Sequence, residues 1–126
     1  MKPKLLLTLT AIYMVFIGLR TLISPAGTFG LDAGATAILI ASVRSIASLY
    51  IGFAVLNWFA RGAEASKARD AIFLSNTVVF GLWTILWVLI ILAGGPAFGW
   101  LFVVIHLLFT VGFFVVGRAN MSTNTT

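Results

Sequence analysis

Apolar residues run through most of the chain, and the few interruptions define its elements. Residues 71–117 contain no Asp, Glu, Lys or Arg over 47 positions. A helix needs about 20 apolar residues to cross the hydrocarbon core of a membrane, so this stretch is too long for one span and about right for two. The segment AGGPAFG (Ala93–Gly99) divides it, because Gly and Pro end helices and form turns. The pattern predicts helices over about 70–93 and about 97–118.

The first half of the chain repeats this pattern. Its apolar runs predict helices over about 5–23 and about 36–60. The segment SPAGTFGLDAGA (Ser24–Ala35) between them predicts a loop, and RGAEASKARD (Arg61–Asp70) is the one predicted loop rich in charge. The basic start MKPKLLL also fits a signal peptide. The following TLISPAGTFG offers no good small-x-small cleavage site, so a first transmembrane helix is favoured.

Composition places the chain in lipid. Hydrophobic residues make up 61% of it and charged residues 9%, whereas soluble domains average about 45–50% and about 25%. A soluble chain of 126 residues has too much surface to hide this much apolar side chain. There is no cysteine, which excludes disulfides and thiolate metal sites within the chain. The net charge of +5 comes from dispersed residues beside apolar segments, a pattern that does not indicate nucleic-acid binding.

The distribution of Lys and Arg predicts how the helices are threaded. If the N-terminus is inside, six basic residues lie on the inner side: Lys2, Lys4, Arg61, Lys67, Arg69 and Arg118. Arg20 alone lies at the outer ends of the helices, and Arg44 lies within the second helix. Because cytoplasmic loops carry the excess of Lys and Arg, both termini are predicted to be cytoplasmic. A bias this strong argues against dual-topology insertion.

These features predict an all-α fold, an integral membrane four-helix bundle that forms one transmembrane domain over residues 1–126. Short connections favour neighbouring antiparallel helices. One face of the second helix carries the small residues Ala41, Ser45, Ser48 and Gly52. Small residues let helix backbones approach closely, so this face is predicted to pack against another helix.

The predicted threading brings polar residues together in the outer half of the bundle. At 1.5 Å per residue, Arg44 lies roughly 10–12 Å and His106 roughly 12–14 Å below the outer interface. Arg20 is about one turn from the outer end of its helix, and Asp32 lies in the first loop. Tyr13 precedes Arg20 by seven residues and therefore shares its helix face. These five residues are the candidate ligand-binding set.

Two interpretations of Arg44 stay open. An Arg at membrane depth costs about 2.5–3.5 kcal/mol on insertion scales. Its long stem lets the guanidinium reach up to the headgroups or pair with Asp32. Alternatively Arg44, with His106 and Arg20, faces an internal cavity and binds an anionic or carbonyl-bearing group, to which a guanidinium offers five donors in a fixed fork. His106 likewise either hydrogen-bonds between helices or relays protons.

Missing residue types narrow the function classes. The three acids, Asp32, Glu64 and Asp70, all fall in predicted loops or at helix ends, which disfavours proton-coupled export of cationic drugs. No metalloprotease, hydrolase or phosphate-binding motif is present. With one His and no Cys, no metal site and no cofactor are predicted. Trp83 and Trp87 form an i,i+4 pair that is either the wall of a flat ligand site or ordinary apolar bulk.

Two segments of the first half resemble a known family. The pattern GLRTLISP (Gly18–Pro25), followed by VRSIASLYIGFAVLNWFAR (Val43–Arg61), resembles small bacterial four-helix membrane proteins of the DoxX-like kind. The resemblance covers about half of the chain, and Arg44 and Pro25 are the positions that carry over. It implies a compact four-helix bundle that serves quinone-linked redox chemistry as an accessory, or acts as an envelope factor.

The hypothesis that combines these features is a non-enzymatic, multi-pass protein of the bacterial inner membrane. It binds a lipid-like or quinone-like amphiphile around Arg44 and His106, or serves as an accessory subunit of a membrane complex. Two alternatives stay open. One is a small anion transporter or channel that works as a homo-oligomer, and the other is a subunit of a quinone-linked oxidoreductase in which His106 handles protons.

Overall fold

The protein is built from helices. The computed structural model describes residues 2–32 and 34–121, and no strand occurs among them. Its helices are α1 (Pro3–Ile23), α2 (Pro25–Phe29), α3 (Ala37–Ala60), α4 (Lys67–Leu92) and α5 (Gly99–Ala119). Within the described ranges four of them, α1, α3, α4 and α5, are long and apolar enough to cross a membrane. These are the four long helices that the apolar runs predicted.

The helix ends differ from the predicted ones where capping groups act. Helix α4 begins three residues earlier than predicted, because the Ser66 hydroxyl accepts a hydrogen bond from the Arg69 amide at 3.2 Å. This cap brings part of the charged segment into the first turn. The predicted loop before α3 contains the short helix α2, which has Pro25 at its start and ends at Gly30 with φ of 67°. Proline suits the first helical turn and glycine the left-handed end.

The chain divides into two compact units, and each is described by itself. One unit comprises Leu7–Arg61, with most of α1 together with α2 and α3. The other contains α4 and α5, with the first six residues of the chain. The prediction of one four-helix domain over residues 1–126 concerns the packing of these units on each other, and it stays a prediction.

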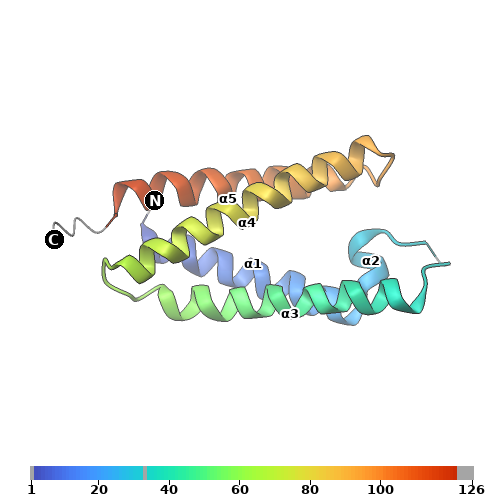
Figure 1. Cartoon of the computed structure of the whole chain (residues 1–126), viewed down its shortest axis with the longest axis horizontal. Helices are drawn as coiled ribbons and strands as arrows, with labels where there is room; N and C mark the ends of the chain where they lie inside the picture. The colour runs from blue at the N-terminus through green and yellow to red at the C-terminus, as the bar shows by residue number, and fades with distance from the viewer. Residues whose placement is uncertain (1, 33, 122–126) are drawn as a thin grey trace. The chain divides into compact units, whose positions relative to one another are not determined.

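In the first unit, α1 and α3 run alongside each other (Figure 1). Their backbones approach closely at Gly18. A methyl group added at Gly18 would lie 2.9 Å from Cγ1 of Ile51 and 3.3 Å from the backbone oxygen of Ala47. The buried positions of α3 recur at intervals of three and four residues: Val43, Ala47, Tyr50, Ala54, Asn57 and Ala60. This spacing is one face of an α-helix.

The predicted packing face of α3 was wrong. All four of its small residues, Ala41, Ser45, Ser48 and Gly52, are exposed. The buried face combines the small Ala47 and Ala54 with the large Tyr50. Because every face of α3 is nearly equally apolar, small side chains alone did not identify the face that packs.

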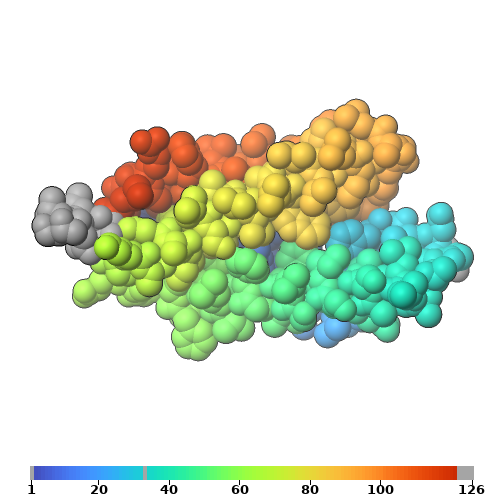
Figure 2. Space-filling model, in the orientation of Figure 1, coloured from blue at the N-terminus to red at the C-terminus, as the bar shows by residue number. Residues whose placement is uncertain are grey.

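In the second unit, α4 and α5 form an antiparallel hairpin (Figure 1), and their side chains meet along the face shown in Figure 2. Gly94 turns the chain with φ of 89°, and the Gly95 amide donates to the Ile90 oxygen at 2.9 Å. At the other end of the hairpin, the Arg69 guanidinium donates to the Asn120 oxygen at 3.0 Å and to the Ala63 oxygen at 3.2 Å. Both ends of the hairpin are therefore fixed by backbone acceptors.

The contact at Gly18 generates a stability prediction. Gly18→Val should lower the free energy of unfolding by about 1–3 kcal/mol, because the added carbons overpack the contact with Ile51 and Ala47. Gly52→Val on the same unit is the matched control, since nothing lies within 4 Å of a Cβ there. It should stay within about 0.5 kcal/mol of the wild type. The measurement is helicity during SDS titration of the purified protein; equal effects of both substitutions would contradict the close approach.

Candidate functional site

Arg44 is the one charged residue of α3, and it lies on a surface of apolar residues and serines. It follows the first residue of α3 by seven positions, or about 10 Å along the helix. Its side chain is exposed, and it makes no hydrogen bond or salt bridge with the described residues. Exposed apolar side chains lie near it along the helix, including Ile38, Leu39 and Leu49. The guanidinium therefore offers five donors to an acceptor from outside the described chain.

The serines around Arg44 direct their protons back to their own helix. Ser42 donates to the Ile38 oxygen at 2.8 Å, and Ser45 donates to the Ala41 oxygen at 3.0 Å. Ser48 donates to the Ser45 oxygen at 2.7 Å. Such bonds satisfy each hydroxyl proton without a partner helix. These hydroxyls are therefore not donors to a ligand, and Arg44 is the strong donor of this surface.

Arg20 has a partner inside its own unit. Its Nη2 donates to the backbone oxygen of Gly27 in α2 at 3.2 Å. This bond ties the last turn of α1 to the short helix that follows it. The side chain remains exposed, so its other donors face outward. Arg20 thus holds α2 in place and still presents charge at the same end of the unit as Arg44.

Asp32 and Tyr13, two other members of the predicted set, belong to this unit as well. Asp32 is exposed in the connection between α2 and α3, and its backbone oxygen accepts from the Ala35 amide at 3.0 Å. Across residues 2–32 and 34–121, no ion pair joins Asp32 to Arg44 or to Arg20. Tyr13 is half-buried, about two turns before Arg20 on α1. The charges at this end of the unit are therefore not neutralised by one another.

His106 lies in the other unit, inside an aromatic cluster. It is 1% exposed on α5. Its ring centroid lies 5.6 Å from that of Phe80, 6.0 Å from that of Trp83 and 6.0 Å from that of Phe102. Because Arg44 and His106 belong to different units, their predicted common cavity stays a prediction. In the structure, His106 lies among aromatic rings of α4 and α5.

The aromatic cluster joins α4 to α5 along most of the hairpin, and sequence reasoning did not identify it. Phe80 stacks on Phe109 with centroids 4.7 Å apart, and Phe73 meets Phe113 edge to face at 5.4 Å. Trp87 stacks on Phe102 with centroids 4.7 Å apart and an angle of 12°. The signal was present in the sequence. Aromatic rings recur every seven residues in α4, at Phe73, Phe80 and Trp87, and every three or four residues from the N-cap of α5 onward, at Phe98, Phe102, His106, Phe109 and Phe113.

The two rings of the Trp83–Trp87 pair therefore lie in different surroundings, and they do not line an open site in an equivalent way. Trp87 is 2% exposed, and Phe102 covers its ring. Trp83 is half-buried and contacts His106. Of the two interpretations of the pair, apolar bulk describes Trp87.

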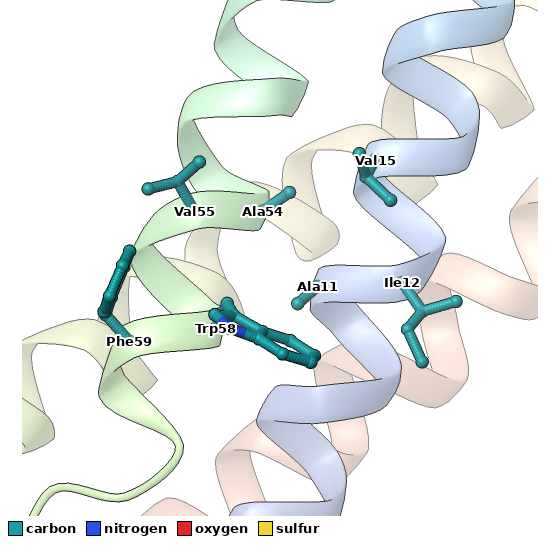
Figure 3. Close-up of a pocket in the computed structure, with 7 residues that line it drawn as sticks. All are labelled: Ala11, Ile12, Val15, Ala54, Val55, Trp58 and Phe59. Atoms are coloured by element: carbon teal, nitrogen blue, oxygen red, sulfur yellow. The ribbon is translucent and has the colours of Figure 1, made fainter.

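Each unit carries an apolar groove on its surface. The groove of about 310 Å³ between α1 and α3 is lined by Ala11, Ile12, Val15, Ala54, Val55, Trp58 and Phe59 (Figure 3). The groove of about 240 Å³ between the start of α4 and the end of α5 includes Phe73, Phe113 and Arg118. Neither groove is lined by a residue of the predicted set. Among the residues that the structure describes, no three His, Cys, Asp or Glu side chains gather to hold a metal ion.

The aromatic cluster generates a second stability prediction. Trp87→Ala should lower the free energy of unfolding by about 3–5 kcal/mol, because it removes a buried ring and leaves a cavity against Phe102. Trp100→Ala is the matched control, since Trp100 is exposed near the same end of the hairpin and should change stability by about 0.5 kcal/mol or less. SDS titration followed by circular dichroism measures both. The cluster would not hold the hairpin together if the two substitutions had equal effects.

Comparison of the chain with family models, with curated proteins and with solved structures finds no match. The resemblance to DoxX-like proteins therefore stays a prediction. What the protein does is inferred from its own residues.

Proposed function

We propose that the protein is a non-enzymatic, multi-pass protein of the bacterial inner membrane that binds a lipid-like or quinone-like amphiphile through Arg44. The observation that carries the proposal is the exposed Arg44 guanidinium, which has no acceptor among the described residues and lies on an apolar helix. A second cation, Arg20, lies at the same end of the same unit.

The energetic argument starts from the cost of a bare cation. An Arg within a membrane span costs about 2.5–3.5 kcal/mol on insertion scales. The cost falls when the guanidinium meets an acceptor, and no described residue supplies one. A carboxylate, a phosphate or a quinone carbonyl would supply it. A guanidinium binds the first two through paired, charge-assisted hydrogen bonds.

The surface beside Arg44 has room for such a ligand. Ala41 and Ser48 lie three residues before and four residues after Arg44, on the same helix face, and both are exposed. Their small side chains let a ligand approach the helix backbone. The exposed Ile38 and Leu49 provide apolar contacts nearby. An amphiphile with a polar head on Arg44 and an apolar body along α3 matches this pattern.

The distribution of charge supports an orientation with both termini in the cytoplasm. Lys67 begins α4, Arg118 lies in the last turn of α5, and Arg61 directly follows α3. At the opposite helix ends Arg20 is the one basic residue in the sequence. Cytoplasmic segments carry the excess of Lys and Arg, so the ends that hold Lys67, Arg118 and Arg61 are placed inside.

The orientation can be tested with single cysteines, because the chain has none of its own. In intact cells, a maleimide that does not cross the inner membrane should label Ala97→Cys fully and Glu64→Cys hardly at all. Both positions are exposed, and they lie in the connections at opposite ends of α4. Detergent permeabilisation should make both cysteines react, which controls for accessibility. The reverse pattern, or labelling of both in intact cells, would contradict the proposed topology.

The ligand proposal is tested by native mass spectrometry of the purified protein. Wild type should carry a defined amphiphile. Arg44→Leu should bind that amphiphile about 10- to 100-fold more weakly and no longer carry it. A hydrogen bond to a charged group contributes about 1.5–3 kcal/mol, and each 1.4 kcal/mol is tenfold. Arg44→Lys should bind with intermediate affinity, because an ammonium keeps the charge but not the fork.

Arg118→Leu is the control for the loss of a surface charge, since Arg118 is exposed in the last turn of α5. It should retain the amphiphile. The ligand-binding proposal is overturned if wild type carries nothing specific, or if Arg44→Leu retains the amphiphile as the wild type does. Unchanged helicity and a single monodisperse species confirm that each variant is folded.

A further inference from the structure

The groove between α1 and α3 combines an apolar channel with a cation at one end. Its seven lining residues are all apolar. Ala11 and Ala54, each 4% exposed, are its smallest side chains, and the larger Val15, Val55 and Trp58 flank them. Figure 3 shows the Trp58 ring extending from α3 toward Ala11 of α1. The volume of about 310 Å³ is at the lower end of the range of ligand pockets, about 300–1,000 Å³.

Arg61 covers the Trp58 ring at the end of this groove. Its Cζ lies 3.3 Å from the centroid of the ring, which is the geometry of a cation–π contact. Arg61 directly follows the last residue of α3. In the described part of the chain, no carboxylate pairs with its guanidinium. The groove therefore ends at an indole ring with an uncompensated positive charge stacked on it.

The side chains in and beside the groove indicate which class of ligand it can bind. Apart from the Trp58 indole N–H, the lining side chains offer no hydrogen-bonding group, so the groove suits an alkyl chain better than a sugar or a peptide backbone. A helix of a partner protein is about 10–12 Å across with its side chains. It is therefore too wide to fit into a groove of about 310 Å³. The single recognition group, Arg61, attracts negative charge. Trp side chains favour the interface between the hydrocarbon core and the headgroups, which is where a lipid places its charge.

We propose that this groove binds one acyl chain of an anionic phospholipid, with the lipid phosphate held by the Arg61 guanidinium. This site differs from the one proposed at Arg44. The two arginines are 17 residues apart in the sequence, about 25 Å along the direction of α3. A lipid on Arg61 and an amphiphile on Arg44 therefore lie toward opposite faces of a membrane that α3 crosses.

The test is a lipid titration of the full chain after delipidation, followed by native mass spectrometry. The probes are phosphatidylglycerol and phosphatidylcholine with identical acyl chains. Both lipids carry the phosphate, but phosphatidylcholine also carries a choline cation, which Arg61 repels. Wild type should therefore bind phosphatidylglycerol at least about fivefold more tightly, a difference of about 1 kcal/mol. Arg61→Gln should remove this difference between the two lipids.

Filling the groove tests the acyl chain independently of the headgroup. Val15 is 39% exposed and lines the groove, so Val15→Phe can enter the channel without disturbing the buried contact between the helices. It should weaken both lipids equally, by about tenfold. Ile12→Phe, at a residue that is 54% exposed, is a second filling variant in case Val15→Phe does not fold.

Two matched variants separate this proposal from general effects. Lys67→Gln removes an exposed cation at the start of α4 that lines neither groove, and it should leave phosphatidylglycerol binding unchanged. In an Arg44→Leu background, Arg61→Gln should still remove the preference for phosphatidylglycerol, so the two proposals can fail separately. The groove proposal is overturned by equal binding of both lipids to wild type, by an equal loss in Lys67→Gln and Arg61→Gln, or by unaltered binding in the folded filling variants.

Discussion

The protein has more apolar side chain than its own interior can bury, and the other features follow from that constraint. In the most apolar 18-residue window of each long helix, the buried share ranges from 17% in α4 to 44% in α1. The rest of the surface needs an apolar surrounding, and in such a surrounding an unpaired charge is expensive. Charged side chains are therefore the informative positions, and their partners indicate what each of them does.

The long helices could be predicted because a run of apolar residues fixes a membrane-length helix almost alone. The predictions of helix ends and of the packing face were wrong where they depend on contacts that a run of apolar residues does not encode. The early start of α4 depends on the Ser66 hydroxyl, and α2 forms because Pro25 and Gly30 suit the two ends of a short helix. The packing face of α3 is set by its fit around Gly18, which nothing in the uniformly apolar sequence of α3 reveals.

For the candidate site, the sequence predicted the chemical groups but not their partners. Arg44 was identified because a charge inside an apolar run is conspicuous, and its exposure agrees with either a snorkelling or a ligand-binding role. The bond from Arg20 to Gly27 depends on how the chain folds back after α1. The groove beside Trp58 needs Ala11 and Ala54 to face each other, although they are 43 residues apart in the sequence. No local sequence pattern predicts a contact between residues so far apart in the chain.

The cationic side chains in the described part of the chain differ in the groups that they contact. Arg69 donates to two backbone oxygens, and it fixes the loop before α4 and the end of α5. In the second unit, aromatic residues of α4 and α5 contact one another around His106. On α3, by contrast, Arg44 has no acceptor among the described residues, and Arg61 rests on an indole ring that leaves its charge uncompensated. A stacked guanidinium keeps its in-plane donors free for a phosphate. This contrast is the reason why ligand binding is proposed at α3.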